Sequence, residues 1–280
     1  MEKNLYLLRT ARIFGIFPFE ILDNNIQTSA KLKIINLVII IFLIVGALIT
    51  GGYYNRPLGL VGRIIDAIFG FSAAMGASVM LTNSAAISDT FYKIKFVSED
   101  LIQHMEEIPY SRSNTALILL IFEFCSEIYF MLSMIYIANP NRLWNYGVDI
   151  SYIVIRLYNV LLDIIAILFI SGTNNLFKLI NEKLKLIRRH FFQNMQIVNL
   201  QILHADAGDL FNEVHKCFQL YFLATMWSHA SSLSYVIFQY LNDENFKIWE
   251  EVYWVSYILA QIMALVIVCS ETVNEVIIVN

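Results

Sequence analysis

The sequence carries little charge for its length. Of its 280 residues, 15% are charged and 58% are hydrophobic, whereas about a quarter of the residues in a soluble domain are charged. So few charged groups could not cover a water-facing surface, which argues against an ordinary soluble domain and predicts that lipid is the solvent. The formal net charge is only -4, and nothing in the sequence supports binding to nucleic acid.

Residues and motifs typical of catalysis are also scarce. The three cysteines, Cys125, Cys217 and Cys269, lie in or beside apolar runs and form no CxxC pair, so neither a disulfide framework nor a cysteine metal site is predicted. The chain lacks HExxH, GxSxG and a phosphate-cradling glycine loop, and its five histidines are scattered. These absences argue against an enzyme, and we expect no cofactor and no metal ion.

Long apolar runs are what the sequence has in abundance. A helix needs about 20 mostly apolar residues to cross the hydrocarbon core, and only a helix or a closed barrel satisfies its backbone polar groups there. The runs are too long and continuous for barrel strands, so we predict an all-α membrane protein with a single transmembrane domain over residues 1–280. About six spans are expected, at 34–55, 64–86, 115–138, 150–175, 217–241 and 251–271.

The basic residues predict which ends of the spans face the cytosol. Fourteen Lys and Arg residues precede span one or follow spans two and four, against four on the opposite side. Because Lys and Arg concentrate in cytosolic loops, the N-terminus is predicted inside, unlike that of a G-protein-coupled receptor. Apolar residues recur every three to four positions in 176–216, which predicts a cytosolic helical loop whose apolar stripe packs within the subunit or between subunits.

Four ionisable residues fall within predicted spans three and four. Glu123 and Glu127 are four residues apart and share a helix face, and Arg156 and Asp163 are seven apart and share another. Charges inside lipid are costly and usually face protein or water. They either fix helix packing, for example through an Arg156–Glu127 ion pair, or line a ligand or water-filled cavity.

A cluster of aromatic residues occupies the predicted outer halves of spans five and six. It forms either an aromatic belt at the membrane interface or a pocket open to the outside, with His229 and Gln261 at its floor. The cluster includes Tyr235, Gln239, Tyr253, Trp254 and Tyr257.

The small residues of span two predict close helix contacts.

Four stretches of the chain carry a resemblance: LLRTARIFGIFPFEI (7–21), LFKLINEKLKLIRRHF (176–191), DLFNEVHKCFQLYFLATMWSHASSLSYVIFQY (209–240) and CSETVNEV (269–276). They resemble segments of insect gustatory receptors, the chemosensory relatives of odorant receptors. The resemblance covers nearly the whole chain and agrees with the predicted topology. Members of that family have a seventh span, which carries a Thr-Tyr and a Gln-Phe and lines the pore, and no such motif precedes Asn280. We therefore expect a C-terminally incomplete receptor that does not conduct by itself.

The resemblance implies a gustatory chemoreceptor subunit of the sensory-neuron plasma membrane. Such subunits form ligand-gated, non-selective cation channels for small tastants, as homo- or hetero-tetramers with related subunits in contact with membrane lipid. The alternative is a small secondary transporter that couples ions through Glu127, Asp163 and Arg156, although the paired broken spans typical of that class are absent. The expected ligand-binding residues are Glu127, Arg156, His229, Tyr235, Gln239, Tyr253, Trp254, Tyr257 and Gln261.

Overall fold

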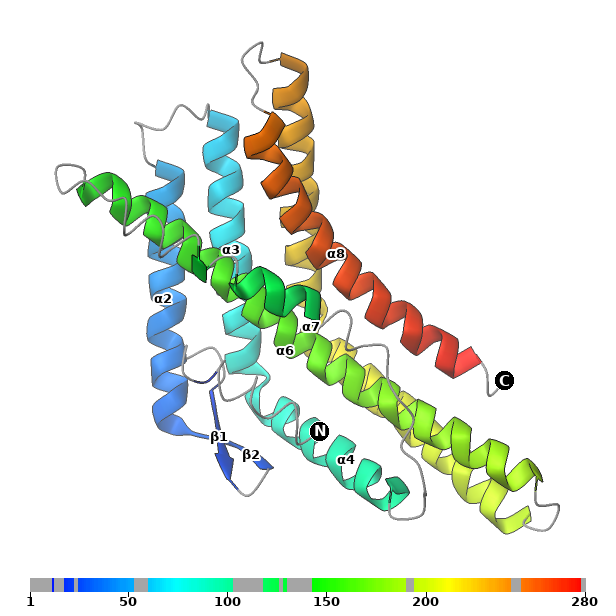
Figure 1. Ribbon diagram of the computed structural model, residues 1–280. Coiled ribbons are helices and arrows are strands. Elements are labelled where there is room, and N and C mark those ends of the chain that lie inside the picture. The colour runs from blue at the N-terminus through cyan, green and yellow to red at the C-terminus, as the bar shows by residue number, and fades with distance from the viewer. Residues whose placement is uncertain are drawn as a thin grey trace.

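The structure is a computed structural model that describes residues 12, 18–22, 25–52, 60–102, 118–125, 128–129, 143–189, 194–242 and 248–277. Almost all of this part of the chain is helical (Figure 1), which confirms the predicted all-α class. Residues 118–125 form one helical segment. The longer helices are α2 (Ala30–Gly52), α3 (Leu60–Thr82), α4 (Ser84–Ile102), α6 (Leu143–Arg189), α7 (Asn194–Asn242) and α8 (Ile248–Ile277).

Four stretches of helix in the described residues are long and apolar enough to cross a membrane. They are Ala30–Ile49, Arg63–Thr82, Ile153–Lys185 and Val255–Glu275, and they coincide with predicted spans one, two, four and six. The predicted fifth span, 217–241, lies in α7, where Ser, His, Gln and Tyr side chains dilute its apolar residues. Most of the predicted third span lies outside the described residues, so spans three and five remain predictions.

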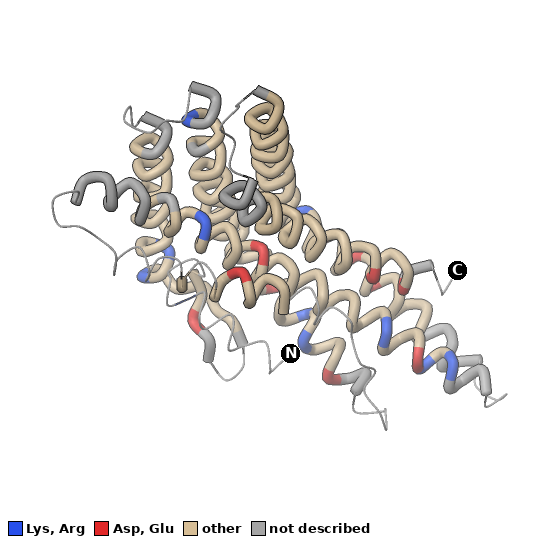
Figure 2. Tube along the Cα trace, turned by 45° about the horizontal axis from the view of Figure 1, so that its top comes forward, with Lys and Arg blue, Asp and Glu red and all other residues tan. Residues whose placement is uncertain are grey.

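Charged residues gather at one end of the bundle, which we call the charged end. Figure 2 shows them on α4, on the second half of α6, on the first half of α7 and on the last turns of α8, whereas the upright helices are nearly free of charge. Residues 176–189 and 194–216, predicted as a cytosolic loop, are helical and continue α6 and α7 into the charged end. The candidate span of α6 extends to Lys185 and so overlaps the first part of this predicted loop. This distribution fits the predicted orientation, in which the charged end faces the cytosol.

A bend at Asn83 carries the chain from the apolar region into the charged end. The backbone hydrogen bonds continue through the bend, from Asn83 N–H to the Val79 carbonyl at 2.9 Å and from Ile87 N–H to the Asn83 carbonyl at 2.8 Å. The Asn83 side-chain amide leaves its own helix and donates to the Cys217 carbonyl of α7 at 2.9 Å. This bond holds the bend, where α3 ends and α4 turns away (Figure 1), against α7.

A small β-hairpin precedes the first span and was not predicted from the sequence. Its strands, β1 (Phe19–Leu22) and β2 (Asn25–Thr28), are antiparallel, with Phe19 opposite Thr28. Phe19 and Ile26 are buried, and Ser88 of α4 donates a hydrogen bond to the Ile26 carbonyl at 2.7 Å. The hairpin therefore closes the charged end of the bundle against α4.

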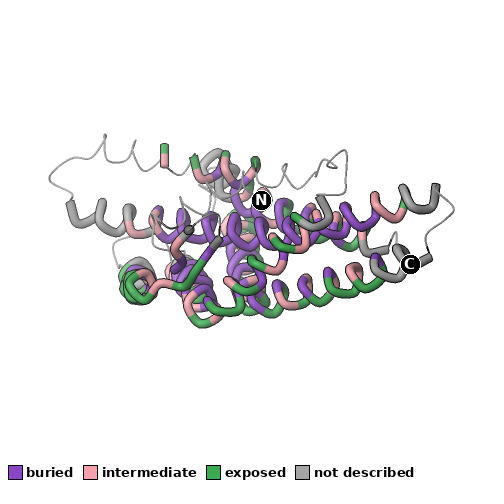
Figure 3. The backbone as a smooth tube through the Cα atoms, turned by 90° about the horizontal axis from the view of Figure 1, so that it is seen from below, coloured by how far each residue is buried: buried purple, intermediate pink, exposed green. Residues whose placement is uncertain are grey.

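Among the candidate spans, that of α6 is the most buried and that of α2 the least. Figure 3 colours the backbone by burial and shows the buried stretches gathered in the middle of the molecule. In the most apolar 18-residue stretch of α6, 94% of the residues are buried, against 28% in that of α2. Small residues on α3 allow close contact with both neighbours, as predicted. A Cβ atom at Gly70 would come within 2.3 Å of Ala47 of α2, and one at Gly76 within 2.6 Å of both Leu162 of α6 and Tyr221 of α7.

Candidate functional site

One face of α6 carries three polar side chains through the apolar region. Arg156, Asn159 and Asp163 follow one another at spacings of three and four residues, so they share a helix face. Their exposed fractions are 1%, 2% and 0%. Asp163 lies about 15 Å along the helix from the start of the span at Ile153, which is near the middle of a ~30 Å hydrocarbon core.

The Arg156 side chain meets α8 in the half of the bundle away from the charged end. Its guanidinium carbon lies 4.1 Å from the centre of the Tyr257 ring, a cation–π contact that is strengthened where water is excluded. The Tyr257 hydroxyl is 3.5 Å from the Arg156 carbonyl, and the Gln261 amide donates to that hydroxyl at 3.2 Å. Arg156 is thus held by ring and backbone contacts from one face of α8.

Asp163 is bound by a different helix, α7. The Tyr221 hydroxyl donates to Asp163 Oδ1 at 2.8 Å and also lies 3.1 Å from the Asn159 carbonyl. The Asn159 amide oxygen accepts a bond from the Ser72 hydroxyl of α3 at 3.3 Å. These contacts join α3, α6 and α7 through buried polar groups.

We call this buried set the polar seam: Ser72, Arg156, Asn159, Asp163, Tyr221, His229, Tyr257 and Gln261. The His229 ring lies 6.0 Å, centre to centre, from the Phe69 ring of α3. Among the described residues, Asp163 Oδ2, Gln261 Oε1 and both His229 ring nitrogens have no hydrogen-bond partner. Buried polar atoms are rarely left unpaired, so these atoms mark a place that water or a polar ligand would complete.

The structure brings together only part of the predicted ligand-binding set. Tyr257 contacts both Arg156 and Gln261, and His229 is buried beside Phe69 of α3. Tyr235 and Gln239 form a separate pair on α7, with a 2.8 Å bond from the Gln239 amide to the Tyr235 hydroxyl.

Other predicted residues are described only in part. Glu127 and the side chains of Tyr253 and Trp254 lie outside the described residues, so the predicted Arg156–Glu127 ion pair stays a prediction. Glu123 is buried, with 6% of its surface exposed, within the helical segment 118–125.

Sequence analysis missed the partners that hold the seam together. Asn159 lies on the same face as Arg156 and Asp163, and its spacing was a signal that could have been used. Tyr221 gave no such signal, because only the fold brings α7 against α6. Within the described residues, no group of three or more His, Cys, Asp or Glu side chains is arranged to hold a metal ion.

The charged end holds a second polar contact line, between α6 and α8. The Asn174 amide donates to Glu271 Oε2 at 3.2 Å, and the Lys178 ammonium lies 3.9 Å from the same oxygen. One turn further, the Asn181 amide donates to the Glu275 carboxylate at 2.9 Å. These bonds connect the two helices where they leave the apolar region.

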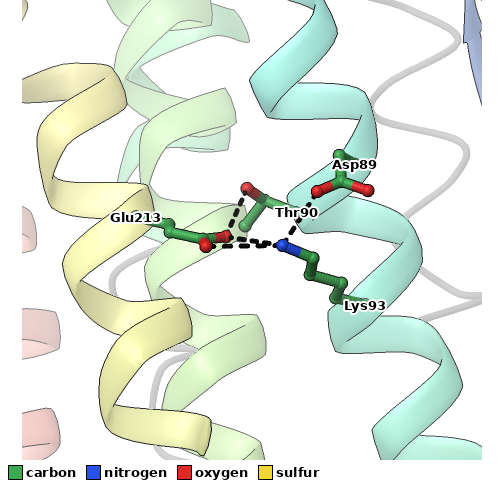
Figure 4. Close-up of polar contacts among 4 residues, drawn as sticks. All are labelled: Asp89, Thr90, Lys93 and Glu213. Carbon is green, nitrogen blue, oxygen red and sulfur yellow. Dashed lines mark hydrogen bonds and ion pairs between the residues drawn. The ribbon is translucent and has the colours of Figure 1, made fainter.

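Helices α4 and α7 are joined at the charged end by an ion pair (Figure 4). The Lys93 ammonium lies 2.8 Å from Asp89 on its own helix and 3.3 Å from Glu213 on α7. The Thr90 hydroxyl is 3.5 Å from the same Glu213 carboxylate. The hydrogen bond to Asp89, followed by the bond to Glu213, raises the pKa of Lys93 above its usual value of 10.5.

Two cavities lie between α7 and α8, both towards the charged end. The first has a volume of about 270 Å³ and is almost entirely apolar, with Phe222, Met226 and Leu265 among its lining residues. The second has a volume of about 360 Å³ and is bordered by Phe177 and His204, whose rings meet edge to face at 5.2 Å. Burial lowers the pKa of His204 below its usual 6.5.

A bundle of apolar, membrane-length helices with polar side chains buried at its centre defines a polytopic helical membrane protein. A family model described as 7tm chemosensory receptor matches residues 5–276. The chain therefore belongs to the 7tm chemosensory receptor family, the broad group that the sequence resemblance predicted.

A solved structure supports the fold independently. The chain is similar to the insect olfactory receptor OR5 from Machilis hrabei, with a TM-score of 0.66 and 12% identity, over 98% of this chain and 80% of that one. Such low identity shows a shared fold only. No curated protein matches the sequence.

Proposed function

We propose that this membrane chemosensory receptor is a gustatory subunit, part of a ligand-gated, non-selective cation channel for small tastants. It would act in the plasma membrane of sensory neurons, in homo- or hetero-tetramers with related subunits. The observation that carries the proposal is the polar seam, whose unpaired atoms lie on His229 and Gln261, in the half of the bundle predicted to face outside, and on Asp163, near mid-depth.

The chemistry of the seam indicates the kind of ligand. The His229 ring can donate or accept a hydrogen bond, and the Gln261 carbonyl can accept one. The face of the Tyr257 ring is already in contact with Arg156. A small molecule with hydroxyl or amide groups would satisfy these atoms, whereas a purely apolar one would leave them unpaired at a cost. Family membership argues for this ligand role over the ion-coupling transporter.

The test is a concentration–response measurement in cells that express the chain together with related subunits. Calcium entry would be recorded with a panel of sugars, polyols and alkaloids. Gln261→Leu and His229→Phe each remove one hydrogen-bonding group, and the effective concentration of an active tastant should rise about tenfold, the value of one such bond. Gln201→Leu is the matched control, because Gln201 is exposed at the start of α7.

Two outcomes would contradict the proposal. One is the absence of any evoked current when surface biotinylation shows the receptor at the plasma membrane. The other is an unchanged concentration–response curve in both seam variants. The fold shared with an olfactory receptor makes odour detection the second candidate, and responses to volatile compounds but to no tastant would favour it.

A further inference from the structure

The carboxylate of Asp163 is buried, and one of its two oxygen atoms has nothing to bind. The Tyr221 hydroxyl donates to Oδ1. Among the described residues, Oδ2 has no hydrogen-bond partner, and no basic side chain forms an ion pair with Asp163. Arg156 lies two turns away, about 10 Å along α6. Because a buried carboxylate is costly unless its charge is compensated, a positive charge is expected beside Oδ2.

Three kinds of occupant would complete the Oδ2 atom, and they differ in what they satisfy. A water molecule would donate a hydrogen bond but would leave the negative charge uncompensated. A proton on Oδ2 would remove the charge, but the new O–H group would have no acceptor among the described residues. A bound cation compensates the charge and also occupies the free lone pairs of Oδ2, so a cation fits both observations.

The atoms around Asp163 fit a small monovalent cation. The Tyr221 hydroxyl oxygen lies 2.8 Å from Asp163 Oδ1 and 3.1 Å from the Asn159 carbonyl oxygen, so three oxygen atoms gather between α6 and α7. Oxygen donors suit hard cations. In the part of the chain that the structure describes, no three His, Cys, Asp or Glu side chains are grouped to hold a metal ion. A single carboxylate therefore balances an alkali cation, whereas a divalent ion would leave excess positive charge.

A stripe of polar side chains on α7 connects Asp163 with the outer end of that helix. Its six members are spaced four, three, four, three and four residues apart, so they share one helix face. The first four are at most 5% exposed, and the last two are partly exposed. Hydroxyl and amide groups replace part of an ion's hydration shell, so the stripe offers a cation a route from outside. The members are Tyr221, Thr225, Ser228, Ser232, Tyr235 and Gln239.

We propose that Asp163 binds one alkali cation, which enters from outside along the α7 stripe. The cation lies beside Oδ2 and takes the Tyr221 hydroxyl oxygen as a further ligand. It stabilises the packing of α6 against α7 in the absence of any tastant, so this inference does not rest on the proposed taste function.

The test is the melting temperature of the full chain, purified in detergent without tastant, in NaCl, KCl or choline chloride at constant pH and ionic strength. At ten times its dissociation constant, the bound ion should raise the melting temperature by about 3 °C relative to choline chloride. Asp163→Asn keeps the shape of the side chain but removes its charge, and should abolish the difference between the salts. Tyr221→Phe keeps the charge and removes one ligand, so the half-maximal concentration should rise about tenfold.

The control is Asp209→Asn, because Asp209 is exposed on α7; this variant should keep the salt dependence of the unmodified chain. Equal melting temperatures in the three salts would overturn the proposal, as would a salt dependence that survives Asp163→Asn. A chain that ignores the salts but is stabilised by acid would assign a proton to Asp163 instead. If Asp163→Asn does not fold, Tyr221→Phe decides, and an unshifted half-maximal concentration there overturns the proposal.

Discussion

Helices α6 and α2 are both long and apolar, but their surroundings differ. Side chains of α2 such as Ile34, Val38 and Leu48 are 60–65% exposed, and no charged residue lies between Lys33 and Arg56. Helix α6 is buried throughout residues 155–174, and this stretch carries Arg156 and Asp163. An apolar sequence therefore shows that a helix lies out of water. The polar residues within the helix show whether its neighbours are lipid or protein.

The largest loss of stability is expected where α6 and α7 lie closest to α3. A side chain at Gly76 would collide with Leu162 and Tyr221, so Gly76→Val should destabilise the protein by about 3 kcal/mol, at the upper end for overpacking. The readout is thermal unfolding in detergent, followed by a thiol-reactive dye.

The matched control for that substitution is Gly208→Val. A Cβ at Gly208 meets nothing within 4 Å, so the gain in helix propensity should leave stability unchanged or slightly higher. Equal losses at Gly76 and Gly208 would mean that helix α3 does not approach its neighbours as closely as described.

A truncation on each helix tests the contrast between α6 and α2 directly. Leu162 of α6 is 1% exposed, and Leu48 of α2 is 60% exposed. Lipid tails are as apolar as leucine, so the free energy of transferring the leucine side chain between lipid and protein is close to zero. What remains is the free-energy cost of the cavity that the truncation leaves. Leu162→Ala should cost about 2.5 kcal/mol, whereas Leu48→Ala should stay within about 0.5 kcal/mol. Equal shifts in unfolding temperature would contradict the burial contrast.

The polar bonds of α6 should matter next. Tyr221→Phe removes the donor to Asp163 Oδ1 and should cost about 2 kcal/mol, as for a bond to a charged or strongly polar group. Tyr92→Phe is the control, because Tyr92 is exposed and stacks on Phe96. Unfolding in sodium dodecyl sulfate titrations measures the stability of both variants. A loss of stability no larger for Tyr221→Phe than for Tyr92→Phe would show that the bond to Asp163 does not stabilise the protein.

The fold class followed from sequence because it depends on local properties. Runs of apolar residues and the 3.6-residue periodicity of segments such as 176–189 are visible without any neighbour. Which helix lies at the centre was not visible, since α2 is at least as apolar as α6. The polar residues Arg156 and Asp163 held that information, and they were interpreted as a packing device or a cavity lining with no means of choosing.

The candidate site could be predicted only where one helix supplies it. Arg156 and Asp163 share α6, so their seven-residue spacing was enough to predict a common face, and the structure buries both side chains. Tyr221 and Ser72 come from other helices, and only tertiary packing brings them to Asn159 and Asp163. The hairpin β1–β2 was missed because two strands of four residues carry little periodicity, and its stability depends on contact with α4.

The smallest effect is expected at the solvated charged end, where Lys93 joins α4 to α7. Because the pKa of Lys93 is raised above 10.5 in the folded protein, its stabilisation is complete below pH 10.5 and is lost as the pH rises through the folded-state value. Both partners are about two-fifths exposed, so Glu213→Gln should cost less than about 1 kcal/mol after screening by solvent. Glu182→Gln is the control, since Glu182 pairs with Lys185 within one helix. The measurement is the melting temperature of Glu213→Gln and of the unmodified chain at pH values below and above 10.5. The two melting temperatures should differ at the lower pH and converge at the higher pH. If the difference persists at the higher pH, the ion pair is not the cause of the lost stability.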